Sequence, residues 1–326
     1  MTPDRNKIKP HIYIVTPASE KANNGNWFTA SRWARFLRQR YRVTLALTWD
    51  GTPCDAMIAL HARRSAASIA AFAAKHPALP LVIVLTGTDL YRDIHTDADS
   101  RHSLELASHL VVLQPEGVQE LDPDWRSKTT VIYQSAPSLK PLEMNVKRRM
   151  RRFDVVMIGH LRHEKDPLTF MRAAQYLTSR RIRLLHIGGA LEPVFAFHAG
   201  STQQTYPHYR WLGHLPRTQT RQRLKRSQLM VIASAMEGGA NVIIEAVTSG
   251  VPVLASDIPG NRGMLGGDYA GYFPRGDSLA LARLIETAAT DDAYYDRLQA
   301  QCAARAPLFL PEREQAAVLN LMNGLL

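Results

Sequence analysis

The sequence predicts an α/β protein made of two Rossmann-like, doubly wound domains. Strands that are apolar on both faces alternate with helices, the alternation stops once near the middle of the chain, and it then begins again. Parallel strands read as continuous apolar runs because helices cover both faces of their sheet. The length of 326 residues also favours two domains, since a single hydrophobic core rarely grows so large.

The first half supplies five expected strands and two expected helices. The strands are residues 11–16, 42–47, 56–60, 81–85 and 109–113. The helices are residues 27–40 and 65–75, and the first of them repeats apolar side chains at helical spacing. A polar stretch at 18–26 is expected to be the loop between the first strand and the first helix.

The second half repeats the pattern after a break at 134–152, which holds Pro137, Pro141 and a basic run at 147–152. The expected strands are 153–158, 183–187, 230–233 and 251–255, and the expected helices are 166–178, 241–249, 278–290 and 311–326. We therefore expect an N-terminal domain over 1–146, a second over 147–310, and a final helix at 311–326 that packs back on the first domain. Ligands of such sheets bind beyond the carboxyl ends of the strands, so the two domains are expected to face each other across a cleft.

Composition excludes several classes of function. The net charge is +11, yet no nucleic-acid-binding module accompanies it, which leaves anionic small molecules as partners of some of the arginines. No apolar run is long enough for a membrane span, and we see no signal peptide and expect no stable membrane association. Cys54 and Cys302 stand at no zinc spacing, so we expect ordinary thiols in a reducing cytoplasm and no metal or other cofactor.

The strongest motif follows the strand at 230–233 and opens the helix at 241–249. It consists of Glu237, Gly238, Gly239, Ala240, Asn241 and Glu245. The glycines let backbone N–H groups approach an anion at the start of the helix. Glu237 is expected in the loop before the helix and Glu245 eight residues later, about two helical turns along the same face. Each carboxylate can accept hydrogen bonds from vicinal hydroxyls. A helix cap and a surface glutamate are the structural alternative for such a pair.

Two shorter segments of the second half also follow strands. Gly159 begins a turn in which Arg162 and Lys165 stand three residues apart, and such a pair can clamp a diphosphate and stabilise it as a leaving group. Gly213 and His214 form a later turn, for which an ordinary strand-to-helix connection is about as well supported as a ligand contact.

The first half carries two candidate donor-binding residues, Gly25 and Asn26, and a set of candidate acceptor-binding residues, distributed over three loops. Gly25 and Asn26 lie in the loop after the first strand, where a glycine lets the backbone approach a reacting centre. An anion pocket is expected from side chains at the start of the helix at 65–75, and a neighbouring loop holds an aspartate that could orient or deprotonate an acceptor. These side chains are His61, Arg63, Arg64, Thr86, Thr88 and Asp89. A basic surface turn and a helix-capping aspartate are equally supported alternatives.

The glutamate motif, with its flanking Gly-Gly-Ala-Asn and Gly-Val-Pro, resembles the signature of the family 4 glycosyltransferases, which have the GT-B fold. The resemblance implies that Glu237 contacts the donor sugar and that Glu245 holds the ribose. It also implies that Arg162 and Lys165 bind the donor diphosphate without a metal, and that Gly213 and His214 lie against the nucleobase.

Segments of the first half resemble the selenosugar synthases of selenoneine biosynthesis. They are Asn-Gly-Asn-Trp at 24–27, His-Ala-Arg-Arg-Ser at 61–65 and Thr-Gly-Thr-Asp-Leu-Tyr at 86–91. This resemblance implies a UDP-sugar donor, UDP-N-acetylglucosamine or UDP-glucose, and selenophosphate as acceptor. It also implies selenophosphate synthetase and selenoneine synthase as pathway neighbours.

Three alternatives remain at this point. A conventional family 4 enzyme with a saccharide or lipid acceptor would share the donor site and differ in the first domain. A catalytically silent sugar-nucleotide sensor would be expected to have lost Glu237, Arg162 or Lys165, all of which are present. A nucleic-acid-binding protein driven by charge alone would show salt-dependent binding.

Overall fold

The computed structural model describes residues 9–20, 25–142 and 151–326 and divides the chain into two compact units. The first unit is Met1–Gln134 together with Pro311–Leu326, and the second is Ser135–Leu310. The division therefore lies before the proline-containing segment. The expected boundary at 146/147 and most of the basic run at 147–152 fall outside the described residues.

The first unit is built on a parallel sheet of six strands in the order β2-β1-β3-β4-β5-β6. The strands are β1 (His11–Val15), β2 (Arg42–Ala46), β3 (Ala56–Leu60), β4 (Leu81–Leu85), β5 (His109–Val112) and β6 (Thr129–Val131). Every residue of β1, β3 and β4 is buried, as expected for strands covered on both faces. The chain leaves β1 toward β2 on one side and returns to β3 on the other, so the topological switch point lies between β1 and β3.

Helices cover both faces of this sheet. They are α1 (Gly25–Leu37), α2 (Ala66–Lys75), α3 (Ile94–Thr96), α4 (Ala98–Leu106), α5 (Glu116–Gln119), α6 (Pro123–Arg126) and α15 (Pro311–Leu325), with a π-helical turn at Asp89–Asp93. Alternate residues of a strand point to opposite faces, so Ile12 and Ile14 pack against Trp33 of α1, whereas Tyr13 and Val15 belong to the core under α2 and α4.

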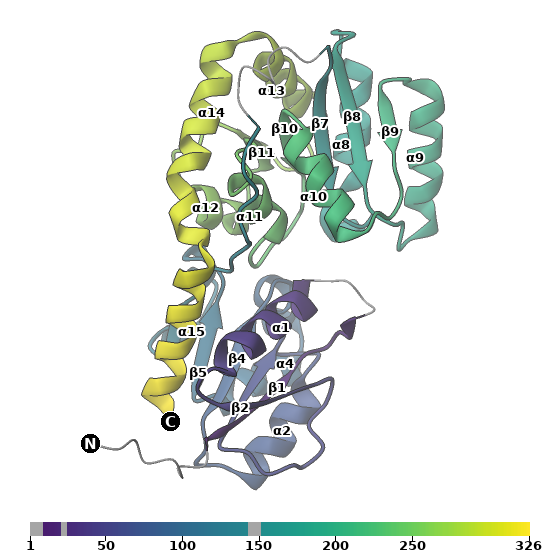
Figure 1. The fold of residues 1–326 in the computed structure, drawn as a ribbon. Coiled ribbons are helices and arrows are strands. Elements are labelled where there is room, and N and C mark those ends of the chain that lie inside the picture. Colours follow the sequence, from purple (N-terminus) through teal and green to yellow (C-terminus); the bar gives the residue numbers. More distant parts are fainter. Residues whose placement is uncertain (1–8, 21–24, 143–150) are drawn as a thin grey trace, which may run out of the picture. The chain divides into compact units, whose positions relative to one another are not determined.

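The last helix of the chain belongs to the first unit and packs along α1 (Figure 1). The carboxylate of Glu314 is buried and accepts hydrogen bonds from Arg32 Nε at 2.6 Å, Arg32 Nη2 at 2.9 Å and Trp33 Nε1 at 2.8 Å. Val318 and Met322 complete the core on this face of the sheet. The buried ion pair thus joins two segments that are 282 positions apart in the sequence.

The second unit has its own six-stranded parallel sheet in the order β12-β11-β10-β7-β8-β9. The strands are β7 (Phe153–Ile158), β8 (Ile182–Ile187), β9 (Tyr209–Trp211), β10 (Leu229–Ile232), β11 (Val253–Ser256) and β12 (Tyr272–Phe273). From β7 the chain proceeds through β8 to β9 at one edge and then crosses back to β10. The switch point lies between β7 and β10, which is where doubly wound sheets bind ligands.

The helices of the second unit include several that the hydrophobic pattern does not reveal. The set is α8 (Pro167–Ala173), α9 (Pro193–Thr205), α10 (Arg217–Arg226), α11 (Asn241–Val247), α12 (Pro259–Leu265), α13 (Ser278–Thr290) and α14 (Asp292–Arg305), with 3₁₀ turns at His163–Lys165, Ala174–Tyr176 and Ala306–Phe309. The helix expected at 166–178 ends at Ala173 and continues as the 3₁₀ turn.

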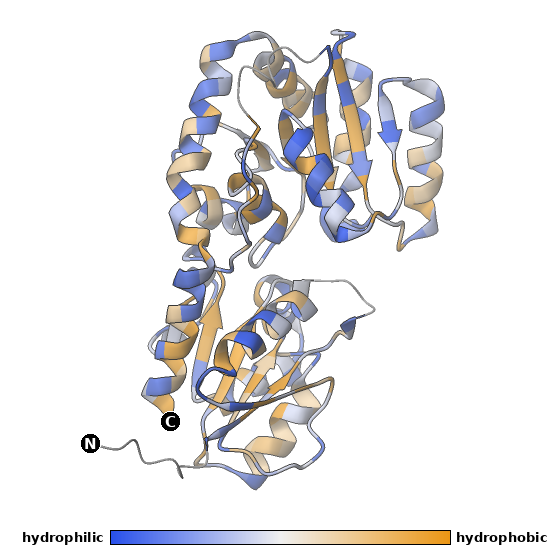
Figure 2. Cartoon of the chain, viewed as in Figure 1, coloured by the Kyte–Doolittle hydropathy of each residue, from blue (hydrophilic) through white to orange (hydrophobic). Residues whose placement is uncertain are grey.

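Hydropathy follows the layers of each unit: the strands are mostly hydrophobic, and the covering helices carry both kinds of residue (Figure 2). No helix in the described part of the chain has the length and apolar character needed to cross a membrane. Cys54 and Cys302 are buried, and burial raises the pKa of each thiol to about 11. Both thiols are therefore protonated at neutral pH, which agrees with the expectation of ordinary, unreactive cysteines.

Candidate functional site

The loops that follow β7 and β10 come together at the switch point of the second sheet. The backbone N–H of Ala235, after β10, donates to the carbonyl oxygen of Glu164, after β7, at 2.9 Å. Lys165 Nζ donates to Glu237 Oε1, so a lysine and a glutamate 72 positions apart form an ion pair. The structure thus joins two of the residues that the sequence places in one donor site.

Glu237 is held in place from several directions. Its Oε1 also accepts from Ser234 Oγ at 2.6 Å, and its side chain is only 10% exposed. A Cβ on Gly260, at the start of α12, would lie 1.9 Å from the Glu237 carbonyl oxygen, so only glycine allows α12 to approach this closely. A buried carboxylate with a lysine and a hydroxyl on one oxygen is a fixed, charged hydrogen-bond acceptor.

Arg162 and Lys165 differ in their surroundings, although the sequence treats them as a pair. Lys165 ends the 3₁₀ turn and points to Glu237, with a side chain that is 20% exposed. Arg162 precedes the turn in extended backbone, its side chain is 37% exposed, and its Nε lies 3.8 Å from Glu164 Oε2. Arg162 is therefore the more accessible of the two cations.

Glu245 lies on α11 and is bound by two arginines of α10. Its Oε1 accepts from Arg217 Nη2 at 3.0 Å and Nε at 3.3 Å, and Arg221 Nε lies 3.9 Å away. As expected, Glu237 lies before the helix and Glu245 lies on it, since α11 begins at Asn241. Glu237 belongs to the preceding loop, which holds Gly238, Gly239 and Ala240, and the two carboxylates are oriented separately.

The turn after β9 closes the same edge of the sheet. Gly213 has a left-handed backbone with φ of 66°, and its carbonyl oxygen accepts from Gly188 N at 2.8 Å. The exposed ring of His214 stacks on that of His160, which follows Gly159, with ring centres 6.0 Å apart and planes within 8°. Burial lowers the pKa of His160, and the nearby cations Arg162 and Lys165 lower it further. The ring is therefore neutral at neutral pH.

In the first unit, Gly25 and Asn26 lie in the first turn of α1, so the expectation that they belong to a loop is wrong. The Gly25 carbonyl accepts a hydrogen bond from Thr29 Oγ1 at 2.8 Å, which is an ordinary helical contact. The preceding residues 21–24 lie outside the described part of the chain. Because Gly25 adopts helical backbone geometry, it does not provide the flexible backbone that was expected to approach a reacting centre.

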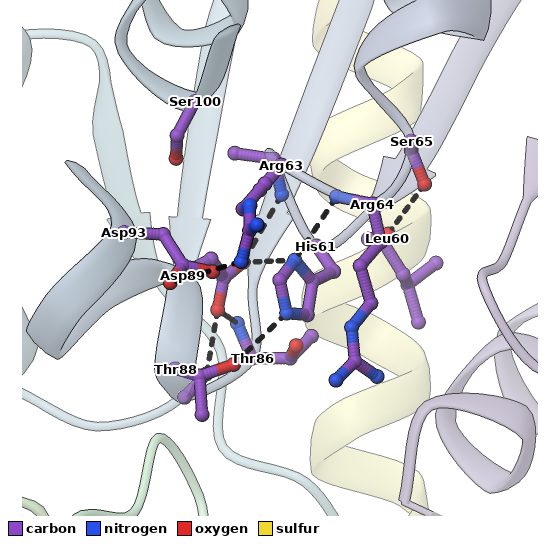
Figure 3. A network of polar contacts seen from close by, with 12 residues as sticks. Leu60, His61, Arg63, Arg64, Ser65, Thr86, Thr88, Asp89, Asp93 and Ser100 are labelled. Carbon is purple, nitrogen blue, oxygen red and sulfur yellow. Dashed lines mark hydrogen bonds and ion pairs between the residues drawn. The ribbon is translucent and has the colours of Figure 1, made fainter. Parts of the chain in front are cut away.

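Asp89 is buried and holds the loop after β4 to the turn after β3. Its Oδ1 accepts from the backbone N–H groups of Thr86 at 2.9 Å and Gly87 at 2.8 Å, and its Oδ2 accepts from Ala62 N at 3.1 Å (Figure 3). The side chain is 0% exposed. These contacts favour the structural alternative for Asp89 over a role at an acceptor, because backbone amides engage both of its oxygens and the side chain is fully buried.

His61 occupies the turn directly after β3 with a left-handed backbone, φ 70°, and is 2% exposed. Its Nδ1 accepts from the backbone N–H of Arg64 at 3.3 Å, and its Nε2 lies 3.0 Å from Thr88 Oγ1 (Figure 3). The contact between Nδ1 and Asp89 Oδ2 is 3.9 Å, too long for a hydrogen bond. His61 therefore links the two loops through Thr88.

Arg63 and Arg64 point in different directions. Arg63 Nε lies 3.0 Å from Asp97 Oδ2 and its Nη1 lies 3.8 Å from Asp93 Oδ1. The Arg64 side chain is exposed, and its guanidinium makes no ion pair with the described residues. Figure 3 shows it extending away from Asp93, along the His61 ring toward the end of the ring that contacts Thr88. The two predicted arginines thus divide into one that braces the fold and one that is available.

Metal-ligating side chains are not clustered among the residues that the structure describes. No group of three or more histidine, cysteine, aspartate or glutamate side chains among them is placed to hold a metal ion. The charged groups at the switch point of the second sheet are instead two lysine- and arginine-paired carboxylates and an accessible arginine. Such a set suits a ligand that carries both hydroxyl groups and negative charge.

The region that contains these loops matches a known family. The model of the family described as glycosyl transferases group 1 matches residues 142–306, about half of the chain. The chain belongs to this family. The match includes Lys165, Glu237 and Glu245, together with the strands β7 and β10 between which the loops meet.

Similar proteins of known sequence and structure agree with this membership. The chain is 33% identical over 112 residues to glycosyltransferase 1 domain-containing protein 1 of Xenopus tropicalis, a match that spans 34% of this chain and 32% of that relative. Anabaena HepE in complex with UDP-glucose has a TM-score of 0.77 at 17% identity, covering 97% of this chain and all of that one. Sucrose-phosphate synthase from Thermosynechococcus elongatus has a TM-score of 0.76 at 16% identity, covering 97% and 99%. The two doubly wound sheets therefore form the GT-B fold.

Sequence reasoning missed four side chains that contact the predicted donor-binding residues of this glycosyltransferase. They are His160, Arg217, Arg221 and Ser234. His160 directly follows Gly159, so its position beside a predicted site residue was the sequence signal that could have identified it. Arg217 and Arg221 lie on α10, where only Thr220 and Leu224 are buried and no apolar stripe marks a helix. Their position opposite Glu245 is a consequence of tertiary structure.

Proposed function

We propose that this glycosyltransferase binds a UDP-sugar at the carboxyl ends of β7 and β10 and transfers its sugar to an anionic small-molecule acceptor. The observation that carries the proposal is the Lys165–Glu237 ion pair at the switch point of the second sheet, inside the region that matches the family. The fold similarity to HepE, whose structure contains UDP-glucose, supports a uridine diphosphate donor.

Each charged group has a proposed task at the donor. Glu237 accepts hydrogen bonds from sugar hydroxyls through the oxygen that Lys165 and Ser234 leave available. Lys165 and Arg162 hold the diphosphate, and Glu245 accepts from the ribose hydroxyls while Arg217 fixes its orientation. The backbone of 238–241 and the turn of Gly213 and His214 complete the contacts, as does Gly159.

The chemistry follows from charge. The bond between the anomeric carbon and the β-phosphate oxygen breaks, and its electron pair leaves with UDP. Cations placed at the diphosphate stabilise the charge that develops there, which is the contribution that accelerates such a step. The acceptor's nucleophilic atom supplies the electron pair for the new bond to the anomeric carbon. Lys165 and Arg162 are therefore the proposed catalytic residues, together with Glu237.

For the acceptor we propose selenophosphate, which makes the product a selenosugar. Support comes from the segments at 61–65 and 86–91 and from the exposed Arg64 among them, whose guanidinium makes no ion pair with the described residues. The selenium atom attacks the anomeric carbon and forms a carbon–selenium bond. Water then cleaves the phosphorus–selenium bond, taking the phosphoryl group as phosphate and leaving its proton on selenium. Selenium is a strong nucleophile, so positioning is the main task of the protein in this step.

The test is to incubate the purified full chain with UDP-glucose or UDP-N-acetylglucosamine and selenophosphate under reducing conditions. We expect UDP release together with a sugar whose mass carries the isotope pattern of selenium. UDP release with a saccharide or lipid acceptor, and none with selenophosphate, would replace the acceptor and retain the donor. Turnover that is unchanged in Lys165→Ala, Arg162→Ala and Glu237→Gln would overturn the donor site.

A further inference from the structure

The turn after β3 contains a hydrogen-bonded chain whose direction can be assigned. The backbone N–H of Arg64 donates to His61 Nδ1 at 3.3 Å, so Nδ1 carries no proton. In the neutral ring the proton is then on Nε2, which donates to Thr88 Oγ1 at 3.0 Å. Thr88 thus receives a hydrogen bond from His61 and keeps its own hydroxyl proton for another acceptor.

The side chains around this hydroxyl leave one cation available. The Asp89 carboxylate is engaged by three backbone N–H groups, and Asp93 lies against Arg63 and Arg92, whose Nε is 3.0 Å from it. Arg63 is engaged by Asp97 and Asp93. Arg64 carries the charge that no described carboxylate neutralises, and it extends along the His61 ring toward the end that contacts Thr88 (Figure 3).

The backbone of His61 indicates that this arrangement serves a purpose. A residue with a Cβ rarely adopts a φ of 70°, and His61 does so while 2% exposed. Its N–H donates to Val84 O at 2.9 Å and its carbonyl accepts from Ser65 N at 3.1 Å, so the surroundings hold the conformation. Such outliers cluster at functional sites. This one lies at the carboxyl end of β3, next to the switch point between β1 and β3.

We propose that the Thr88 hydroxyl and the Arg64 guanidinium together bind an oxyanion of the acceptor, and that His61 is a positioning residue that acts through Thr88. The inference rests on the proposed function and refines it, because it assigns which atoms select the acceptor. A hydroxyl that can donate, together with a guanidinium that no described carboxylate neutralises, favours a phosphoryl-type oxyanion over a neutral sugar hydroxyl. Arg63 instead stabilises the turn through Asp93 and Asp97 and is expected to contribute less to acceptor selection.

Substitutions of Thr88 and Arg64 test the two binding groups. The measurement is the KM for selenophosphate and, separately, the KM for UDP-glucose. We expect Arg64→Gln to raise the selenophosphate KM about 10- to 100-fold and Thr88→Val about 5- to 10-fold, with the UDP-glucose KM within about twofold. Thr88→Ser keeps the hydroxyl and is expected to stay within about threefold of the wild type. Arg38→Gln, an exposed arginine at the end of α1, is the matched control.

His61→Asn tests the positioning role, because asparagine tolerates a left-handed backbone and its shorter amide does not reach Thr88. We expect it to raise the selenophosphate KM by the same factor as Thr88→Val. The double variant His61→Asn/Thr88→Val is expected to have a selenophosphate KM no higher than that of either single variant. Residues that act through one contact are non-additive in this way. Additive losses, or equal rises in both KM values, would instead indicate a general structural role and overturn the inference.

Binding of inorganic phosphate separates this proposal from the proposed function. If no selenosugar forms but phosphate binding, followed by ³¹P NMR line broadening, is lost in Arg64→Gln and Thr88→Val, the oxyanion site stands and the reaction is wrong. If selenosugar forms and both variants match the wild type in the selenophosphate KM, the reaction stands and this site is refuted.

Discussion

The proposed donor edge of the second unit, which comprises Lys165, Glu237 and Glu245, differs from the turn after β3 in the first unit. The two regions supply hydrogen-bond donors to their buried carboxylates in opposite ways. Glu237 and Glu245 are paired with the side chains of Lys165 and Arg217, whereas Asp89 is satisfied by three backbone N–H groups. Side chains can exchange a protein partner for a ligand by changing rotamer, but backbone amides within a folded loop cannot. Under the proposed function, we therefore expect the donor edge to exchange partners when ligand binds, and the turn after β3 to act as a fixed frame around Arg64 and Thr88.

The largest expected effect is on the donor edge. Replacing Lys165 with alanine removes a cation from the proposed diphosphate site and leaves Glu237 without its partner. We expect kcat/KM for UDP release to fall about 10³-fold, the range for loss of one transition-state donor. Steady-state kinetics with UDP-glucose measures this. Lys165→Arg keeps the charge and is expected to recover part of the lost kcat/KM. If kcat/KM of Lys165→Ala stayed within tenfold of the wild type, the donor edge would not depend on this cation and the contrast with the turn after β3 would fail.

The frame is tested by stability instead of turnover. Asp89→Asn places an amide group where three backbone donors now converge, so at least one of them loses its acceptor. We expect the free energy of unfolding to fall by about 2 to 3 kcal/mol. Denaturant unfolding followed by circular dichroism measures it, with the exposed Asp99→Asn as control, expected within about 0.5 kcal/mol. An unchanged midpoint for Asp89→Asn would show that the loop does not depend on the carboxylate.

A smaller effect is expected at the second paired carboxylate. Glu245→Gln keeps the shape of the side chain and removes the charge that holds Arg217 and is proposed to accept the ribose hydroxyls. We expect the Kd for UDP to rise about tenfold. Calorimetric titration with UDP measures it. The exposed Glu312 on α15 provides the control variant, Glu312→Gln. Tighter binding by Glu245→Gln would mean that the arginine pairing competes with the nucleotide.

The smallest effect concerns pH and the core beneath the donor edge. Burial lowers the pKa of His186 on β8 to about 3, below its ordinary value near 6.5. The unfolded chain therefore binds a proton that the folded chain excludes, and stability is lost as pH falls below about 6.5. Between pH 7 and pH 5 we expect the wild type to lose about 1 to 2 kcal/mol more than His186→Gln. Unfolding curves at the two pH values measure this, with His95→Gln as an exposed control; equal slopes would contradict it.

Local sequence patterns predicted most of the fold. The strands at 56–60, 81–85 and 153–158 and the helix at 278–290 have the expected bounds because their apolar runs and helical periodicity are local signals. Among the helices that were missed, α9 and α10 carry no clear apolar stripe, and β6, β9 and β12 were missed because they are short strands at sheet edges. At Gly25 the pattern suggested a loop, and helix propagation from the apolar face of α1 decided otherwise.

By itself, the sequence determined the two doubly wound sheets, the glutamate and lysine motifs at the ends of their strands, and membership of a glycosyltransferase family. Tertiary structure alone decided which charges meet. It paired Lys165 with Glu237 across 72 positions and Arg32 with Glu314 across 282, and it buried Asp89 under backbone amides. The physical reason is sequence separation. Hydrophobic periodicity depends on residues that are close in the sequence, whereas an ion pair depends on where separate strands end once the sheet has formed.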